Sequence, residues 1–197
     1  LSDAQRVAII RSTDEAVSRV AGTGFLRTPL TRSDELSEAL GFSATGGIWV
    51  KDETANVGGS HKARHIFTEL LHLLMVEAAG RAPWTPTTRP SLAIASCGNA
   101  AIAASTLAAA VSWPISVHVP PTASVAVLET LKALGATIVV CPRRDTDPAG
   151  DPCVLRFREA VAAGAIPFGV QGTENAWCLD GGRTIGWEIS EELGHFA

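Results

Sequence analysis

The chain has 197 residues, of which 46% are hydrophobic, and it carries a formal net charge of −4 at pH 7. That length suits one ordinary domain or two small ones, and it is long enough to bury a real core. The acidic balance argues against a dedicated nucleic-acid binder, and no apolar run reaches the roughly 18 residues of a membrane helix, so we expect a soluble globular protein with neither partner.

No basic segment precedes an apolar one near the first residues, so no secretory signal is visible and we expect a cytoplasmic location. The four cysteines show no Cys-x-x-Cys spacing and lie far apart in the sequence, at positions 97, 141, 153 and 178. We interpret them as reduced thiols of a reducing compartment, in preference to disulfides or a zinc site.

The first part of the chain is predicted to be helices joined by loops, with one strand. A helix over 3–20 leads to a loop over 22–30, a short helix over 34–40 and a strand over 47–53. Apolar residues at spacings of three and four then predict an amphipathic helix with Ser60 as its N-cap. A connector rich in proline and threonine, over 83–90, is predicted to be a boundary.

Beyond that connector, short apolar strands alternate with helices of about ten residues. The predicted strands are 91–95, 115–119, 136–141 and 166–170, and the predicted helices are 99–111, 124–134, 154–163 and 184–193. Such alternation indicates βαβ units, and therefore an α/β fold with twisted parallel sheets and helices on both faces. Ligands of these sheets usually bind at the carboxyl ends of strands, where two motifs lie.

The first motif, GGSHKARH over 58–65, gathers basic side chains at the start of a helix. A helix N-terminus carries a positive partial charge, so cations there need an explanation. The helix dipole and the neighbouring cations disfavour the charged form of the Lys62 amine. That setting favours attack on a carbonyl, as a Schiff-base lysine requires. The alternative is a solvated lysine whose stem lies over the helix start.

Other interpretations of this motif remain open. An anion such as a phosphate group, bound at the helix start, would offset the crowding of positive charge around Arg64. His61 and His65 are four residues apart and could share one helix face as ligands of a metal hydrolase. Lys62 takes the glutamate position of a His-Glu-x-x-His motif and no third ligand is evident, so we expect no metal. A non-catalytic α/β module that binds a small anion or a protein partner is the alternative from another class.

The second motif is the run of residues from Ser96 to Asn99, at a predicted turn from strand to helix. Gly98 lets the backbone approach a ligand closely, and free amides at the helix start can hold a carboxylate. The Asn99 amide both donates and accepts hydrogen bonds, which suits the orientation of a phenolic or carbonyl oxygen. The alternative is an ordinary cap in which Asn99 satisfies its own turn.

Together these segments resemble the fold type II pyridoxal-phosphate enzymes, which include tryptophan synthase β subunit, cysteine synthase, threonine synthase and serine/threonine dehydratases. Order and spacing agree over nearly the whole chain. The matching segments are RTPL at 27–30, VKDE at 50–53, GSHKAR at 59–64, SCGN at 96–99 and GGRTIGWEI at 181–189. The resemblance implies a two-domain architecture whose second domain is truncated. Residues 1–87 would begin the cofactor domain, 88–165 would form a small mobile α/β domain, and 166–197 would return to the cofactor domain.

The resemblance also implies roles for individual residues. Lys62 would form the Schiff base with the cofactor, pyridoxal 5′-phosphate, and later move the substrate's α-proton. Asn99 would contact the 3′-oxygen of the cofactor, and Ser60 would lie near the reacting β-substituent or the phosphate. His61 stands where tryptophan synthase β subunit has a histidine beside the cofactor phosphate. The substrate carboxylate would be bound by Ser96, Cys97, Gly98 and Asn99.

Two departures qualify the resemblance. Dehydratases and threonine synthases commonly carry phenylalanine at the position of His61, and cysteine synthases commonly carry valine. In addition, the glycine-rich phosphate loop of the family comes after the point at which this chain stops. We therefore expect the chain to be part of a longer, nicked or split enzyme, and to bind the cofactor poorly alone.

The expected activity is α,β-elimination, with deamination, of a small β-substituted L-amino acid such as serine or threonine. The alternative within the family is a β- or γ-replacement synthase of the cysteine, threonine or tryptophan synthase kind. The expected partners are a small amino-acid substrate, a second copy in a homodimer of the complete enzyme, and the C-terminal half of the same protein.

Overall fold

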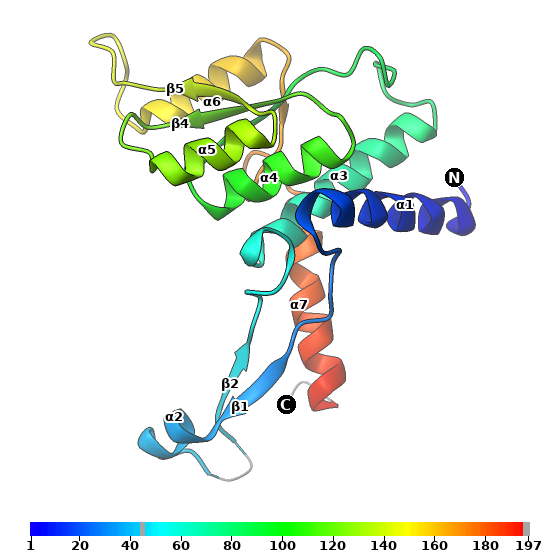
Figure 1. The fold of residues 1–197 in the computed structure, drawn as a ribbon, viewed down its shortest axis with the longest axis vertical. Coiled ribbons are helices and arrows are strands. Elements are labelled where there is room, and N and C mark those ends of the chain that lie inside the picture. The colour runs from blue at the N-terminus through cyan, green and yellow to red at the C-terminus, as the bar shows by residue number, and fades with distance from the viewer. Residues whose placement is uncertain (44–45, 195–197) are drawn as a thin grey trace.

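The structure is a computed structural model and describes residues 1–43 and 46–194 (Figure 1). Helix α1 (Asp3–Ala21) begins at Ser2, where Ser2 and Gln5 form a capping box. It ends at Gly22, whose φ of 77° is the left-handed conformation that favours glycine at a helix C-terminus. Residues at both ends of the helix thus define where it begins and ends, and its span agrees with the predicted helix over 3–20.

Next comes a small antiparallel hairpin that the sequence prediction missed. Strand β1 (Leu30–Ser33) pairs with β2 (Ile48–Lys51), with Leu30 opposite Lys51, and α2 (Asp34–Ala39) lies between them. The prediction of parallel sheets is wrong for this part of the chain. β1 is only four residues long and three of them are polar, so it shows no clear alternation, and its pairing with β2 defines it as a strand.

The second sheet has the expected parallel order. Strands β3 (Leu92–Ala95), β4 (Ile115–Val119), β5 (Thr137–Val140) and β6 (Ile166–Pro167) are arranged in the order β5-β4-β3-β6, and all three pairings are parallel. Helices α4 (Asn99–Ala110) and α5 (Val125–Ala133) make crossovers toward β5. The crossover through α6 (Pro152–Ala162) runs back to β6. Because parallel crossovers are right-handed, α6 lies on the opposite face from α4 and α5, as Figure 1 shows.

Strand β6 is shorter than predicted, ending at Pro167 instead of residue 170. The backbone N–H of Phe168 still donates to the Ala93 carbonyl oxygen, but that of Gly169 donates to the Glu69 carboxyl of helix α3 (Lys62–Ala78), 2.8 Å away. The backbone N–H that follows the last hydrogen bond to β3 is therefore satisfied by a side chain from another element.

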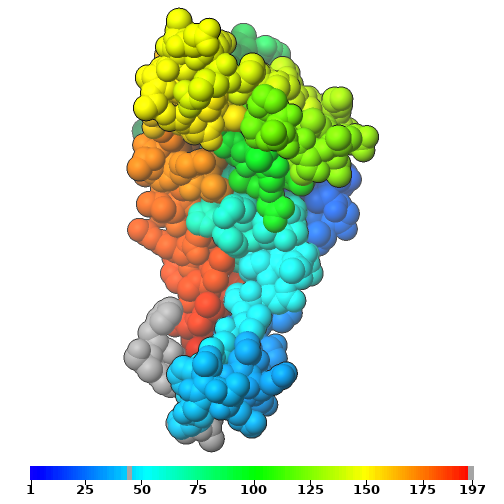
Figure 2. All heavy atoms as spheres, turned by 90° about the vertical axis from the view of Figure 1, so that its left-hand side faces the viewer, coloured from blue at the N-terminus to red at the C-terminus, as the bar shows by residue number. Residues whose placement is uncertain are grey.

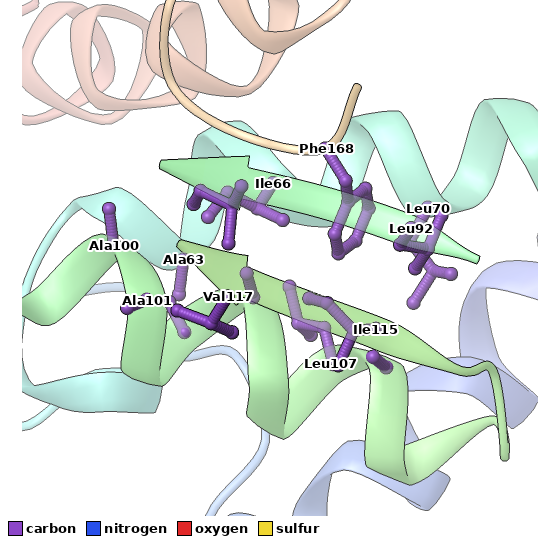
Figure 3. Packing of buried hydrophobic residues seen from close by; sticks show 14 of the residues in the cluster. Ala63, Ile66, Leu70, Leu92, Ala100, Ala101, Leu107, Ile115, Val117 and Phe168 are labelled. Carbon is purple, nitrogen blue, oxygen red and sulfur yellow. The ribbon is translucent and has the colours of Figure 1, made fainter. Parts of the chain in front are cut away.

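The main core lies between this sheet and the helices that cover it (Figure 3). Leu92, Ile94, Val117 and Phe168 are at most 1% exposed. Helix α4 contributes mostly alanines, and small side chains let neighbouring elements approach closely. Figure 3 shows Ala63, at the start of α3, beside Ala100 and Ala101 at the start of α4.

Helix α3 (Lys62–Ala78) crosses α7 (Cys178–Leu193), and the two pack against each other. A Cβ atom added to Gly181 would lie 1.9 Å from the carbonyl oxygen of Arg64, so the backbones meet where no side chain fits. α7 begins six residues before the predicted start at 184, because Gly181 and Gly182 serve close helix packing instead of ending a helix. Figure 2 shows α7 running down one side of the elongated molecule toward the hairpin. Within the described residues, no helix is long and apolar enough to cross a membrane.

Candidate active site

The segment that leads into α3 is a tight 3₁₀ turn, Val57–Gly59. Gly58 and Gly59 have φ values of 68° and 67°, in the left-handed region that side chains disfavour. A Cβ at Gly58 would lie 3.3 Å from the Cβ of Ala103, so this turn rests directly on α4. The glycines thus bring the start of α3 against the first turns of α4.

The helix itself begins one residue later than predicted, with His61 as the N-cap. The expectation that Ser60 is the N-cap is wrong because Ser60 is extended, with φ −167° and ψ 165°. Its hydroxyl nevertheless accepts a hydrogen bond from the Lys62 N–H at 3.4 Å. Lys62 is the first helical residue and is partly exposed, and its Nζ lies 3.2 Å from Nε2 of His61.

The Ser96–Asn99 turn follows β3, as predicted. Gly98 is the N-cap of α4, and its N–H lies 3.5 Å from the Ser96 hydroxyl, which can accept it. In the described part of the chain, no side chain caps this helix start, so Asn99 is not the ordinary cap of the alternative interpretation. A Cβ at Gly98 would meet no atom within 4 Å, which shows open space over the turn. Cys97 is exposed, whereas the other three cysteines are buried, and all four thiols are free.

The two motifs meet because α3 packs against α4 near the start of both helices. Ala63 follows Lys62 and Ala100 follows Asn99, and both alanines belong to the same buried cluster (Figure 3). The fold therefore brings the lysine and the asparagine turn, 37 positions apart in sequence (99 − 62), to one end of the α3–α4 pair.

Arg64 forms a buried ion network, which explains why one of the basic side chains stands at the start of α3. Its Nε and Nη2 donate to the Glu53 carboxylate at 2.8 and 2.9 Å, and its Nη1 and Nη2 donate to Glu188 at 2.6 and 3.1 Å. Nη1 also donates to the Thr184 hydroxyl at 3.1 Å. The guanidinium is 6% exposed, so two carboxylates balance its charge and the explanation by a bound anion does not apply to Arg64.

The network extends to the hairpin. Lys51 lies 2.8 Å from the Glu188 carboxylate and 3.4 Å from Glu192, and its side chain is 8% exposed. Hydrogen bonds from Arg64 and Lys51 outweigh the effect of burial and lower the pKa of Glu188 to about 2. Burial also acts to raise the pKa of Glu53, but hydrogen bonds from Arg64 and Thr28 bring it below the ordinary value. Both carboxylates are therefore ionised at neutral pH.

The two histidines of the motif have different surroundings. Nδ1 of His65 lies 2.8 Å from the Cys178 carbonyl oxygen, to which it can donate. The rings of His61 and His65 meet edge to face, with centroids 5.8 Å apart. Partial burial, followed by the charges of Lys62 and His65, lowers the pKa of His61. Among the residues described, no group of three or more His, Cys, Asp or Glu side chains could hold a metal.

Sequence reasoning missed the Arg64 network, although Glu53 and Glu188 both lie in segments that carry the resemblance. Its members are far apart along the chain, so no periodicity links them. The one signal was the charge of Arg64 itself, because an arginine on a helix face that becomes buried needs carboxylate partners.

The sequence profile described as pyridoxal-phosphate dependent enzyme matches residues 22–197. The chain belongs to this family. Its fold is that of the fold type II enzymes, which confirms the resemblance and the predicted α/β class. No curated protein matches the chain in sequence.

Solved structures of the same fold share little sequence with the chain. Maize serine racemase is 20% identical with a TM-score of 0.66, and the match covers 94% of this chain and 50% of that one. Escherichia coli diaminopropionate ammonia lyase in its apo form is 19% identical, with a TM-score of 0.65 and coverages of 94% and 52%. The processed threonine deaminase isoform 2 of Solanum lycopersicum is 18% identical, with a TM-score of 0.62 and coverages of 98% and 49%. The chain thus spans about half the length of these structures.

The cofactor of the family is pyridoxal 5′-phosphate. The residues present fit its reactive end: an amine stands at the first position of α3, and the uncapped, open turn of α4 lies at the neighbouring helix start. Both helix starts carry positive partial charge, which suits anionic groups. Lys62, His61, Ser60 and Asn99 remain the predicted cofactor contacts.

Proposed function

We propose that the protein is a pyridoxal-phosphate-dependent lyase that catalyses α,β-elimination, with deamination, of a small β-substituted L-amino acid such as serine or threonine. The observation that carries this proposal is that Ala63, next to Lys62, and Ala100, next to Asn99, pack in one buried cluster, within a chain of this family (Figure 3). Diaminopropionate ammonia lyase and threonine deaminase, which share the fold, are named for reactions of this kind, and they support elimination over other outcomes.

Bound pyridoxal phosphate supplies an aldehyde that joins to amines and a ring that withdraws the electrons left when a Cα–H bond breaks. Lys62 Nζ accepts the α-proton and can return it. The open amides at the start of α4, together with Ser96, hold the substrate carboxylate, which fixes the direction of the Cα–H bond. Asn99 orients an oxygen of the cofactor ring through its side-chain amide.

β- or γ-replacement is the second candidate within the family. The two outcomes differ in whether water or another nucleophile captures the product of elimination. The family match supports both equally, and the names of the neighbours favour elimination. The proposed substrate is a small amino acid, because the serine racemase and threonine deaminase that share the fold are named for small amino acids.

The test measures products in the polypeptide that carries these residues together with the rest of the fold. With L-serine or L-threonine we expect a 2-keto acid and ammonia in equal amounts, and none from a Lys62→Ala variant. Lys132→Ala is the matched control, because Lys132 is an exposed lysine on α5. A product in which the β-substituent is replaced by an added thiol, without keto acid, would assign a replacement enzyme. Turnover that survives Lys62→Ala would reject the lysine chemistry and favour a binding module.

A further inference from the structure

We propose that His61 is the proton acceptor for Lys62: its Nε2 takes the proton that must leave the Lys62 amine before that amine can attack a carbonyl. This inference deepens the proposed function, on which it rests for the role of Lys62. It adds a second acid–base group to the site and gives His61 a role toward the lysine itself, beside the contact with the cofactor phosphate that the resemblance implies.

The geometry carries the proposal. Nζ of Lys62 and Nε2 of His61 lie 3.2 Å apart, within reach of a hydrogen bond. His61 is the N-cap and has right-handed helical backbone angles, φ −59° and ψ −15°, and its carbonyl oxygen accepts a hydrogen bond from the Arg64 N–H. Adjacent side chains of a helix do not face each other, so the contact depends on the Lys62 side chain, whose Nζ reaches the ring of His61.

The surroundings of His61 keep its ring neutral near pH 7. Partial burial, Lys62 and His65 all act to lower its pKa, and Glu53, in the segment after β2, acts weakly in the opposite sense. Helix α4, which packs against the start of α3, contributes no titratable side chain. A neutral imidazole offers a lone pair on Nε2, whereas an imidazolium would repel the lysine.

His65 supports the ring of His61 from the next turn of the helix. Its Nδ1 can donate to the Cys178 carbonyl oxygen of α7, which fixes the orientation of that ring, and the His65 ring meets His61 edge to face. His61 itself is exposed. The α3–α7 contact thus orients the ring that His61 meets, and His61 remains accessible to water.

The proton transfer balances without any further reactant. The N–H bond at Lys62 Nζ breaks, its electron pair stays on nitrogen, and the proton joins the lone pair of His61 Nε2. The exposed imidazolium then gives a proton to water and is restored. In the reverse direction the same pair can return a proton to Lys62.

The test compares the reactivity of individual lysines, which is feasible because the chain has only three, at positions 51, 62 and 132. The chain is acylated with trace acetic anhydride, and the modified peptides are quantified by mass spectrometry. Lys132 is exposed and serves as the internal reference, while ion-paired Lys51 should react least. No cofactor is used, so the readout is independent of enzyme activity.

We expect His61→Phe to reduce the Lys62/Lys132 acylation ratio at neutral pH by about threefold or more, because the amine loses the base that accepts its proton as it attacks the anhydride. In the unaltered chain the ratio should also fall as His61 becomes protonated in acid. In His61→Phe this fall should disappear. His61→Gln keeps an acceptor oxygen without a titration, so it should preserve most of the ratio but not its pH dependence.

His72→Phe is the matched control, since His72 lies further along α3, where it stacks on Trp177. It should leave both the ratio and its pH profile unchanged. The proposal is overturned if His61→Phe retains the ratio and profile of the unaltered chain, or if His72→Phe changes them equally. A failure of the proposed function would be seen separately, as turnover that survives Lys62→Ala.

Discussion

Lys62 and Glu69 lie two turns apart on the same helix and have opposite surroundings. Lys62 is partly exposed at the helix start, beside a neutral histidine. Glu69 is fully buried: one carboxyl oxygen accepts the Gly169 N–H at 2.8 Å, and the other has no partner among the described residues. Burial raises the pKa of Glu69 to about 9, although the bond from Gly169 opposes that shift. The start of α3 is therefore accessible and polar, whereas its middle is buried in the core.

Glu69 makes stability depend on pH. Its folded pKa of about 9 lies above the ordinary value of 4.5. The stability it provides when protonated is therefore complete below pH 4.5 and is lost as pH rises toward 9. Glu69→Gln stays neutral at every pH. We expect the free energy of unfolding of this variant, relative to the unaltered chain, to grow with pH by at most about 1.4 kcal/mol per pH unit.

Denaturant unfolding at several pH values between about 5 and about 8 measures this difference. Glu129→Gln, on the exposed side of α5, is the control and should show no such trend. A difference between Glu69→Gln and the unaltered chain that stays constant across this range would show that Glu69 is ionised in the folded protein.

At the scale of elements, the crossing of α3 and α7 holds the active-site helix in place. Glycines let the two backbones touch, and Arg64 joins α7 to the segment after β2 through Glu188 and Glu53. Arg64 is two residues, or about 200° of helix rotation, from Lys62. The ion network therefore holds one side of the first turn of α3, and Lys62 lies on the opposite side.

Gly181→Ala tests this crossing. Alanine normally stabilises a helix relative to glycine by about 1 kcal/mol, but here the new methyl group would meet the Arg64 carbonyl oxygen. We expect a net loss of about 1 to 3 kcal/mol in the free energy of unfolding, as for other overpacked sites. Ser190→Ala on the same helix should change it by less than about 0.5 kcal/mol. A Gly181→Ala variant more stable than the unaltered chain would contradict the close crossing.

The sequence predicted regular βα units well and tertiary contacts poorly. Strand β4 has the predicted bounds, because its apolar run is buried on both faces and ends at Pro120. The start of α7 was missed because Gly181 and Gly182 are breakers by propensity, and only their packing on α3 makes them helical. The lysine and asparagine motifs are candidates from local chemistry together with the family resemblance, whereas the Arg64 network depends on partners up to 124 residues away, which no local pattern reveals.

At the scale of the whole molecule, the chain spans about half of the structures that share its fold. Apolar side chains are exposed on α7 and on the hairpin, with Trp187 of α7 61% exposed and Trp49 of β2 43% exposed. A two-stranded hairpin is marginally stable by itself, so this part gains most from further structure packed against it. We propose that the C-terminal half of the fold covers these side chains.

Because the chain spans only about half of the fold, we expect it to bind the cofactor weakly by itself. The described residues include the proposed reactive amine and the proposed carboxylate-binding turn, and the phosphate loop of the family is expected in the other half. We predict that the 197-residue chain alone, at micromolar pyridoxal phosphate, shows little of the absorbance that comes from cofactor bound to Lys62. Adding the C-terminal half of the fold should produce this absorbance. Strong absorbance from the chain alone would show that these residues suffice to bind the phosphate.

The most direct test of the central claim is to trap the lysine that joins the cofactor. The chain is treated with millimolar pyridoxal phosphate, reduced with borohydride, and mapped by peptide mass spectrometry. We predict that the label is concentrated on Lys62 and exceeds that on the exposed Lys132. Equal labelling of the two lysines, or a label confined to Lys132, would contradict the assignment of Lys62 as the reactive amine.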